Sequence, residues 1–196
     1  APINWAIING ETKTGVTTFF IDDKIDTGAM ILNAETAIGT NESAGELHDR
    51  LIQLGSETVT QTLALLESGK VTTTIQEDNA EIKTAYKLNK ENCKIDWQKP
   101  ASEIHNLIRG LSPYPAAWCF ISDKGEEWNV KIYQSNIVIE AHTLAVGQLV
   151  CTKKELKIAV RDGFIQIESL QFPGKKKMNT AEFLNGIQFT ADAKAY

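Results

Sequence analysis

Hydrophobic spacing in the first part of the chain predicts a helix followed by two strands. Residues 3–7 are apolar at helical spacing, and Gly10 follows them as a stop signal. Residues 15–21 are rich in β-branched and aromatic side chains, which predicts a buried strand. Residues 22–28 are polar and predict a loop, and a second short strand begins at residues 29–32.

A long helix is predicted after this second strand. Ser43 and Glu46 match a capping box, in which the two side chains satisfy free backbone amides at the start of a helix. Leucines near helical spacing then run from Leu47 to Leu66, and Gly69 ends the pattern. Strand, loop, strand and long helix form the end of an α/β domain, and this segment is too short to be a complete one.

The hydrophobic periodicity becomes irregular after Val71, and the chain is polar, with alternating charges, to about Pro100. This composition predicts a linker with little core of its own. A short amphipathic helix is predicted from Ser102, and the prolines within residues 112–115 end it. Its apolar face carries Ile104, Leu107, Ile108 and Leu111.

Alternation with a period of two dominates the rest of the chain. Strands are predicted at residues 118–121, 128–140, 147–151, 156–160 and 164–171. Asp162-Gly163 is a hairpin-turn signal. These short strands suggest a closed or partly open barrel, for which the oligonucleotide-binding (OB) fold is one candidate. A last short helix is predicted at residues 180–185 and a strand-like segment at 187–190.

Composition narrows the class of protein. Hydrophobic residues make up 42% of the 196 residues, which is enough for one or two packed cores and excludes disordered and collagen-like chains. No apolar run approaches the ~20 residues of a membrane-spanning helix. The three cysteines form no C-x-x-C pair, which disfavours a disulfide framework and a Cys-based zinc site. We therefore expect a cytoplasmic protein without a membrane segment.

The net charge of −5 is distributed unevenly. Residues 1–78 carry 4 Lys and Arg against 12 Asp and Glu, whereas residues 79–196 carry 16 against 13. The two parts therefore have net charges of −8 and +3. Such an asymmetry can separate a part that binds a small molecule from a part that binds a polyanion, but it also arises by chance, so the motifs must decide.

Few residues in the sequence are obvious candidates for chemistry. Asp22, Asp23 and Asp26 cluster directly after a predicted strand, where α/β domains hold ligands, although a solvated acidic turn is the simpler interpretation. His48 and His105 lie on predicted helices, where a solvated or capping role is the default. None of the three histidines has a partner at metal-ligand spacing, and no nucleophile elbow or phosphate-binding glycine motif is present. No metal site is predicted.

The densest basic run is formed by Lys175, Lys176 and Lys177. A turn of three lysines is usually only solvated. Placed on the rim of a barrel beside Arg109 and Lys153-Lys154, this run would instead contact the phosphates of a nucleic acid.

Several motifs, in one order across nearly the whole chain, resemble those of the methionyl-tRNA formyltransferase family. In the first part they are APINWAIING at residues 1–10, GVTTFFID at 15–22 and DTG at 26–28. In the second part they are KIDW at residues 94–97, IRGLSPYP at 108–115 and PGKKKM at 173–178. Each motif alone is weak, but the ordered set is highly specific.

This resemblance implies an α/β part followed by a mainly β part. Residues 1–75 would be the C-terminal portion of a Rossmann-like formyltransferase domain, 76–100 a linker, and 101–196 an OB-like tRNA-binding domain. The implied reaction is transfer of a formyl group from 10-formyltetrahydrofolate to the amino group of methionine on initiator tRNA, a step of translation initiation.

The resemblance also implies roles for individual residues. Asp26 aligns with the catalytic aspartate of the family's D-x-x-D-x-G loop. In the family, part of this loop lines the folate site, and that part matches Asp23, Lys24, Ile25 and Asp26. Contacts with tRNA are expected at Arg109, Lys175, Lys176 and Lys177.

The sequence departs from the family in one large respect. The family's catalytic Asn and His belong to N-x-H and H-x-S-L-L-P motifs, and neither motif occurs here. In the family both precede the residues that match, so we interpret the chain as a C-terminal fragment that is catalytically inactive or nearly so. We expect the parent enzyme to be a monomer. The fragment, without the central parallel strands, would expose an apolar face and tend to self-associate.

Three other interpretations stay open. A formyltransferase that acts on a sugar amine, or a formyltetrahydrofolate hydrolase domain, shares the aspartate loop, although the motifs at residues 108–115 and 173–178 favour the tRNA enzyme. A non-enzymatic RNA-binding module belongs to a different class. A structural domain without a ligand is the simplest interpretation of every basic patch.

Overall fold

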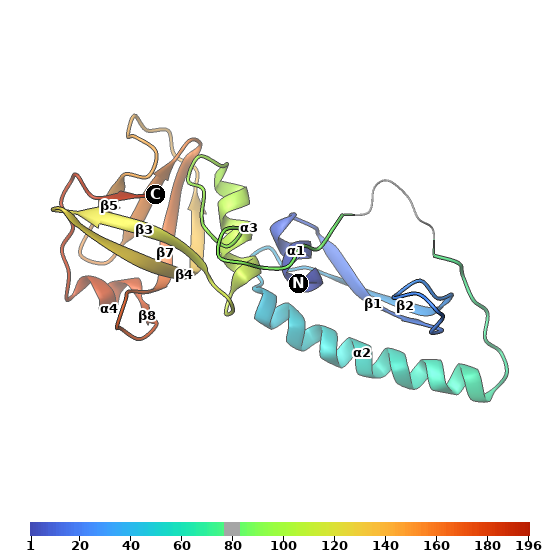
Figure 1. Ribbon diagram of the computed structural model, residues 1–196. Coiled ribbons are helices and arrows are strands. Elements are labelled where there is room, and N and C mark those ends of the chain that lie inside the picture. The colour runs from blue at the N-terminus through green and yellow to red at the C-terminus, as the bar shows by residue number, and fades with distance from the viewer. Residues whose placement is uncertain (77–82) are drawn as a thin grey trace.

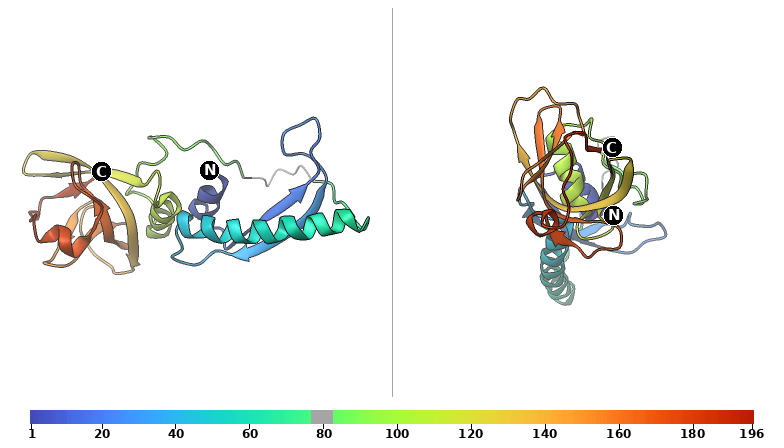
Figure 2. Two further views of the ribbon diagram at one scale, coloured as in Figure 1. Left: turned by 90° about the horizontal axis from the view of Figure 1, so that it is seen from below. Right: turned by 90° about the vertical axis from the view of Figure 1, so that its left-hand side faces the viewer.

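A computed structural model describes residues 1–76 and 83–196. A two-stranded hairpin with a long helix forms one end of the molecule, a curled sheet forms the other, and two helices lie between them (Figures 1 and 2). The helices are α1 (Pro2–Ile8), α2 (Ala44–Glu67), α3 (Ala101–Leu111) and α4 (Thr180–Leu184). The hairpin strands are β1 (Lys13–Phe19) and β2 (Met30–Ala37). The remaining strands are β3 (Ala117–Asp123), β4 (Glu126–Val138), β5 (Leu149–Cys151), β6 (Leu156–Val160), β7 (Gly163–Gln171), β8 (Met178–Asn179) and β9 (Lys194–Ala195).

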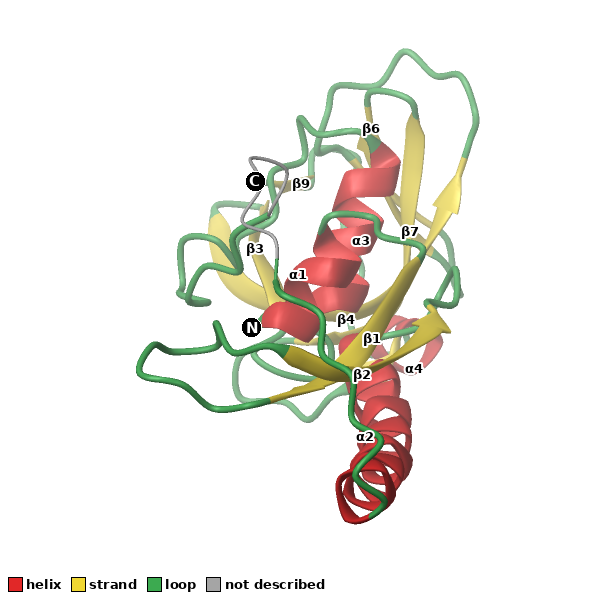
Figure 3. Ribbon diagram, turned by 90° about the vertical axis from the view of Figure 1, so that its right-hand side faces the viewer, coloured by secondary structure: helices red, strands yellow, loops and turns green. Residues whose placement is uncertain are grey.

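The hairpin of β1 and β2 is antiparallel, and Lys13 pairs with Ala37 at its open end. The prediction of a buried first strand is wrong, because exposed and half-buried residues alternate along β1. The physical reason is that α2 packs on one face of the hairpin, as Figure 3 shows, and the other face is open in the described residues. The second strand begins within residues 29–32, as predicted, and stays regular to Ala37 instead of fraying after Leu32.

Helix α2 begins as predicted, with a capping box between Ser43 and Glu46. The predicted leucine stripe is buried only in its first half, where Leu47 and Leu51 are at most 7% exposed. Farther along, Leu63 is 55% exposed, and Thr58 and Thr62 are buried instead. Each threonine hydroxyl donates a hydrogen bond to the carbonyl four residues earlier, at 2.7 and 2.8 Å, which removes most of the cost of burying it. Leu63 and Leu66 are left facing solvent. Self-association of the chain stays a prediction.

Beyond α3 the chain forms a curled, antiparallel sheet with the strand order β5-β6-β7-β4-β3-β9. Backbone hydrogen bonds from Leu149 to Ala193 (3.0 Å) and from Ala195 to Gly147 (2.8 Å) connect its two edges. The sheet is therefore a nearly closed barrel. Gly147 allows this closure, because its φ is +86° and a Cβ there would lie 2.3 Å from the carbonyl oxygen of Ala195.

Two segments contribute to the barrel core against expectation. The prediction of little core before Pro100 is wrong for Cys93, Ile95 and Trp97, which are 2–3% exposed and belong to the main core. Residues 187–190 do not form the predicted strand. They are held instead by the carboxylate of Asp123, which accepts a hydrogen bond from the Thr190 amide at 3.0 Å. The division of the chain at residues 75 and 100 stays a prediction.

Helix α3 joins the two ends of the molecule. It packs on α1 on one side and on β4 and β7 on the other (Figure 3). Its predicted apolar face is confirmed, since Ile104, Ile108 and Leu111 are at most 2% exposed. The predicted turn between β6 and β7 is present, and Asp162 within it accepts a hydrogen bond from the Ala101 amide at the start of α3 (3.0 Å).

The described residues contain no helix with the length and hydropathy needed to cross a membrane.

Candidate functional site

The aspartate loop, defined as residues 20–29, is a closed turn between β1 and β2. The amide of Phe20 donates a hydrogen bond to the carbonyl of Ala29 (3.0 Å), which pins the two ends of the loop together. Gly28 lies so close to the other end that a Cβ there would be 1.5 Å from the carbonyl oxygen of Phe20. The loop can therefore close in this way only with glycine at position 28.

Hydrogen bonds inside the loop fix the position of Asp26. One carboxylate oxygen of Asp22 accepts from the amide of Lys24 and from the hydroxyl of Thr27, both at 2.9 Å. Asp26 itself has a left-handed backbone (φ +58°), and its carbonyl accepts a hydrogen bond from Gln76. Within the described parts of the chain, the Asp26 carboxylate has no hydrogen-bond partner. The loop is thus braced through its backbone and leaves this carboxylate free to meet a ligand.

The four residues expected at the folate site are neighbours in this loop. Asp23, Lys24, Ile25 and Asp26 are all exposed, and Ile25 is 91% exposed. An isoleucine at this exposure offers an apolar surface to a ligand or to another segment of protein. All four side chains are therefore accessible on the surface of the aspartate loop. Their roles in folate binding stay a prediction.

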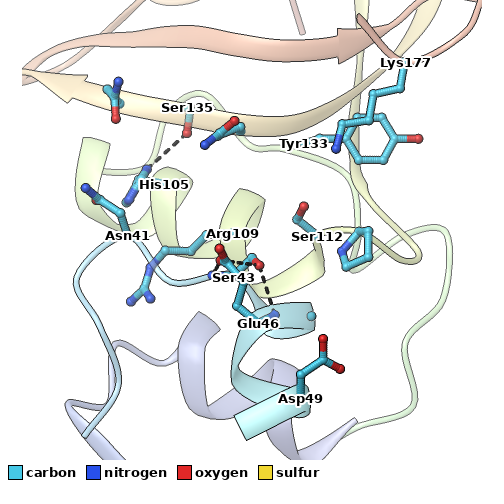
Figure 4. A pocket seen from close by; sticks show the side chains of 14 residues that line it. Asn41, Ser43, Glu46, Asp49, His105, Arg109, Ser112, Tyr133, Ser135 and Lys177 are labelled. Atoms are coloured by element: carbon cyan, nitrogen blue, oxygen red, sulfur yellow. Dashed lines mark hydrogen bonds between the residues drawn. The ribbon is translucent and has the colours of Figure 1, made fainter. Parts of the chain in front are cut away.

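A second candidate is the junction cavity, a polar hollow of about 450 Å³ between the start of α2, α3 and β4 (Figure 4). It is lined by residues from four segments: Asn41, Ser43, Gly45, Glu46, Asp49, His105, Arg109, Ser112, Pro113, Tyr133, Gln134, Ser135, Asn136 and Lys177. Nothing in the sequence grouped these residues into one cavity, because the elements that supply them are far apart along the chain.

Arg109 lies in this junction and not on a barrel rim beside Lys153 and Lys154. Its side chain is 8% exposed, and its guanidinium donates hydrogen bonds to the carbonyls of Gly39 (3.1 Å) and Glu42 (3.0 Å). These bonds tie α3 to the segment before α2. Burial lowers the pKa of Arg109, and the nearby Glu42 opposes this shift. A contact between Arg109 and RNA stays a prediction.

His105 is buried, which corrects the expectation that it is solvated. It is 6% exposed, because α3 is enclosed between β4 and the segment before α2, and its Nδ1 lies 3.1 Å from the hydroxyl of Ser135. Burial, and then the charge of Arg109, lower the pKa of His105. The i, i+4 spacing of His105 and Arg109 was the available signal that both lie on one side of the helix.

Stability below neutral pH is expected to depend on His105. Its pKa is lowered from 6.5 in the folded chain, so the unfolded chain binds more protons once the pH falls below about 6.5. The free energy of unfolding should therefore decrease as the pH falls from there. In His105→Gln, which does not titrate, urea midpoints should vary less between about pH 7 and 5.5 than in wild type. The exposed His48→Gln serves as control, and equal slopes in all three proteins would contradict the prediction.

The lysine turn, defined as Lys175, Lys176 and Lys177, connects β7 to β8. Its backbone is held by a hydrogen bond from the Gln171 amide side chain to the Lys175 carbonyl (2.9 Å). The Lys177 ammonium lies 4.8 Å from the centre of the Tyr133 ring and lines the junction cavity. The structure thus brings Lys177 and Arg109 to one cavity, whereas Lys153 lines a different one.

Across residues 1–76 and 83–196, no three His, Cys, Asp or Glu side chains are grouped so that they could hold a metal ion.

Two protein families match this chain. "Formyl transferase" matches residues 1–63, and "Formyl transferase, C-terminal domain" matches residues 87–188. A methionyl-tRNA formyltransferase from Flavobacterium johnsoniae is 69% identical over 196 residues, which are the whole chain and 62% of that relative. The chain therefore spans a little over three fifths of the length of this curated relative.

Solved structures share the fold. One is HypX from Aquifex aeolicus in complex with tetrahydrofolic acid (TM-score 0.67, 20% identity, 99% of this chain and 36% of that one). Another is an N-formyltransferase from Helicobacter canadensis in complex with folinic acid and dTDP-3-aminofucose (TM-score 0.65, 23% identity, 84% of this chain and 58% of that one). With the aspartate loop in the first matched region and the lysine turn in the second, the chain belongs to the formyl transferase family.

Proposed function

We propose that this chain is part of an enzyme that formylates the methionine amino group of initiator methionyl-tRNA, with 10-formyltetrahydrofolate as donor. The observation that carries the proposal is the 69% identity, over the whole chain, to a methionyl-tRNA formyltransferase. The aligned region is the whole chain, so it includes both the aspartate loop and the lysine turn. Two structures named for tetrahydrofolic and folinic acid complexes support a folate donor.

In this proposal the chain supplies the proton acceptor of the reaction. The methionine amine must be uncharged to attack the formyl carbon, and it loses a proton as the new C–N bond forms and the bond to the folate nitrogen breaks. Asp26 takes that proton, directly or through a water molecule, and the proton then passes to the folate nitrogen that leaves, so that Asp26 ends ionised again. The braced backbone of the aspartate loop supports this role, because it holds the carboxylate in one place while leaving it accessible.

The remaining part of the chemistry requires donors to the oxyanion that forms on the formyl group. The family motifs that carry such donors, N-x-H and H-x-S-L-L-P, do not occur in these 196 residues. We therefore infer that the chain by itself is inactive.

The test compares the complete enzyme that contains this chain with the 196-residue chain alone. We expect the complete enzyme to formylate methionyl-tRNA, and the chain alone to give no product above a control without enzyme. No product from the complete enzyme would overturn the proposed function. Product from the chain alone would overturn only the inferred inactivity.

A formyltransferase that acts on a sugar amine is the second candidate, favoured by the shared fold with the Helicobacter canadensis enzyme. A competition assay separates the two. Methionyl-tRNA and a dTDP-amino sugar are offered to the complete enzyme together, and the formylated product is identified by mass. Formylation of the sugar alone would replace the first proposal with the second.

Binding of tRNA is expected to weaken as salt rises, partly through the lysine turn. Replacing Lys175, Lys176 and Lys177 with Ala should reduce the slope of log K against log salt by about 2–3, since each neutralised phosphate contributes roughly 0.7–0.9. Fluorescence anisotropy with labelled tRNA measures this slope. A charge-matched control replaces Lys13, Lys70 and Lys99. An unchanged slope in the first variant would exclude the lysine turn as a phosphate contact.

A further inference from the structure

The outer face of β3 carries a set of aromatic and basic side chains that the proposed chemistry does not use. We call it the β3 platform, and it consists of Trp118, Phe120, Tyr196, Lys90, Lys94 and Lys131. It lies at the barrel end of the molecule, near the C-terminus and far from the aspartate loop (Figure 1).

The aromatic part of the platform follows from strand alternation. Cys119 and Ile121 point into the barrel core, so Trp118 and Phe120 point outward. Their ring centres are 5.3 Å apart, and Phe120 is 5.8 Å from Tyr196. Tyr196 is held there by two backbone hydrogen bonds with Phe120, both 2.9 Å. Three rings therefore form a continuous, backbone-braced surface.

Three lysines border this surface. The ammonium of Lys94 lies over all three rings, 5.4 Å from the centre of Phe120 and 5.9 Å from that of Tyr196, whereas Lys90 and Lys131 lie beside Trp118. Lys131 is the direct cross-strand partner of Trp118 on β4, and Lys94 is its bridge partner on the opposite side. The ammonium groups of Lys90 and Lys94 lie 5.3 and 5.7 Å from the centre of the Trp118 ring. The indole N–H of Trp118 donates to the carbonyl of Lys90 (2.8 Å), which fixes the ring between these charges.

The charge around Trp118 is not neutralised locally. Among the described residues, no carboxylate lies within 4 Å of the ammonium groups of Lys90, Lys94 or Lys131. Acidic side chains lie toward Tyr196: Glu127 accepts a hydrogen bond from the Tyr196 hydroxyl, and Glu91 and Asp96 line a hollow with Lys94 and Tyr196. The platform therefore has one strongly basic end, centred on an aromatic ring.

A hollow of about 300 Å³ opens beside this basic end. Lys90, Trp118 and Lys131 line it, together with Tyr114, which is 83% exposed. The basic surface also continues toward the lysine turn, because Tyr133 lies two residues beyond Lys131 on β4 and carries the Lys177 ammonium over its ring.

We propose that the β3 platform binds an unpaired nucleotide of RNA, with the base stacked on Trp118 and the neighbouring phosphates held by Lys90, Lys94 and Lys131. Aromatic faces bordered by lysines are the chemistry that single-stranded nucleic acid requires, because bases stack and phosphates pair with ammonium groups. The inference rests on the proposed function in taking the RNA to be the tRNA substrate.

The experiment measures binding of the complete enzyme that contains this chain to tRNA, to an eight-nucleotide adenylate RNA and to an abasic oligomer with the same number of phosphates. Wild type should bind the adenylate RNA about 10-fold more tightly than the abasic oligomer, since stacking one base contributes this much. Trp118→Ala should remove that preference, and Trp118→Phe should keep most of it. Equal binding of the two oligomers by wild type would overturn the proposal.

The lysines are tested in the same titrations. Lys90→Ala combined with Lys94→Ala should lower the salt slope for the adenylate RNA by about 1.4, because each contact with a single strand contributes roughly 0.7. The charge-matched control is Lys13→Ala combined with Lys70→Ala. Equal slopes for the two double variants would overturn the assignment of phosphate contacts.

A fluorescence measurement covers the case in which Trp118→Ala does not fold. Stacking should quench part of the tryptophan emission of wild type, and this part should be missing in Trp118→Phe. Equal quenching in both proteins overturns the stacking role. Two outcomes distinguish this proposal from the proposed function. If the complete enzyme formylates only the sugar, the proposed function is overturned. If it formylates methionyl-tRNA but all platform variants bind tRNA as wild type does, only the role of the β3 platform is overturned.

Discussion

In the complete enzyme, Asp26→Asn is expected to lower kcat for formyl transfer by about 10²–10⁴-fold, the usual contribution of a positioned proton acceptor. Asparagine is nearly the same size as aspartate and accepts the left-handed backbone of this position (φ +58°). The aspartate loop should therefore keep its shape, and the loss should report chemistry. The measurement is the rate of methionyl-tRNA formylation at saturating substrates.

Asp23→Asn is the comparison, since it removes an equal charge from the same exposed loop. Because Asp23 is expected at the folate site, its loss should raise KM for the folate donor, whereas kcat is measured at saturating substrates. Asp23→Asn should change kcat by less than about 10-fold, because a carboxylate that does not receive the proton acts only through longer-range electrostatics. Equal losses in the two variants would show that the charge of the loop, and not a proton acceptor at Asp26, is what the reaction needs.

The second large effect is expected on stability. Arg109→Ala should lower the free energy of unfolding by about 2–4 kcal/mol, because it leaves the carbonyls of Gly39 and Glu42 without their charged donor in a buried site. These two bonds connect α3 with the segment before α2. The loss should therefore affect the contact between the two ends of the molecule, as measured by urea unfolding.

Arg161→Ala provides the comparison, because Arg161 is exposed and its side chain makes only a 3.5 Å contact with Gln98 in the described residues. Its free energy of unfolding should stay within about 0.5 kcal/mol of wild type. A similarly small effect for Arg109→Ala would mean that water replaces its hydrogen bonds without cost, and that the junction is held by apolar contacts alone.

Features governed by neighbours along the chain were predictable from the sequence. The capping box of Ser43 and Glu46 depends on two side chains three residues apart, and it is present. The apolar face of α3 and the strands of the barrel were predictable for the same reason, since each follows from local periodicity. The aspartate loop was located by its position after a strand and by its glycine.

Burial that depends on which distant segment packs against a helix or strand was not predictable from the sequence. Thr62 is buried and Leu63 is exposed, because the hairpin packs against that particular side of α2. The same holds for His105, whose surroundings include residues 30 positions away, and for Trp97, which packs into a barrel formed by later residues. The four segments that line the junction cavity are likewise brought together only by folding.

The family, the helices, the longer strands, the aspartate loop and the lysine turn could be derived from the sequence alone, because these follow from motifs and local spacing. The short strands β8 and β9 could not. The tertiary structure decided that Arg109 is buried in a junction, that Lys177 shares its cavity, and that Lys90, Lys94 and Lys131 surround Trp118. The physical reason is that burial and charge pairing depend on contacts between residues distant in sequence. Local periodicity specifies only which face of each element is apolar.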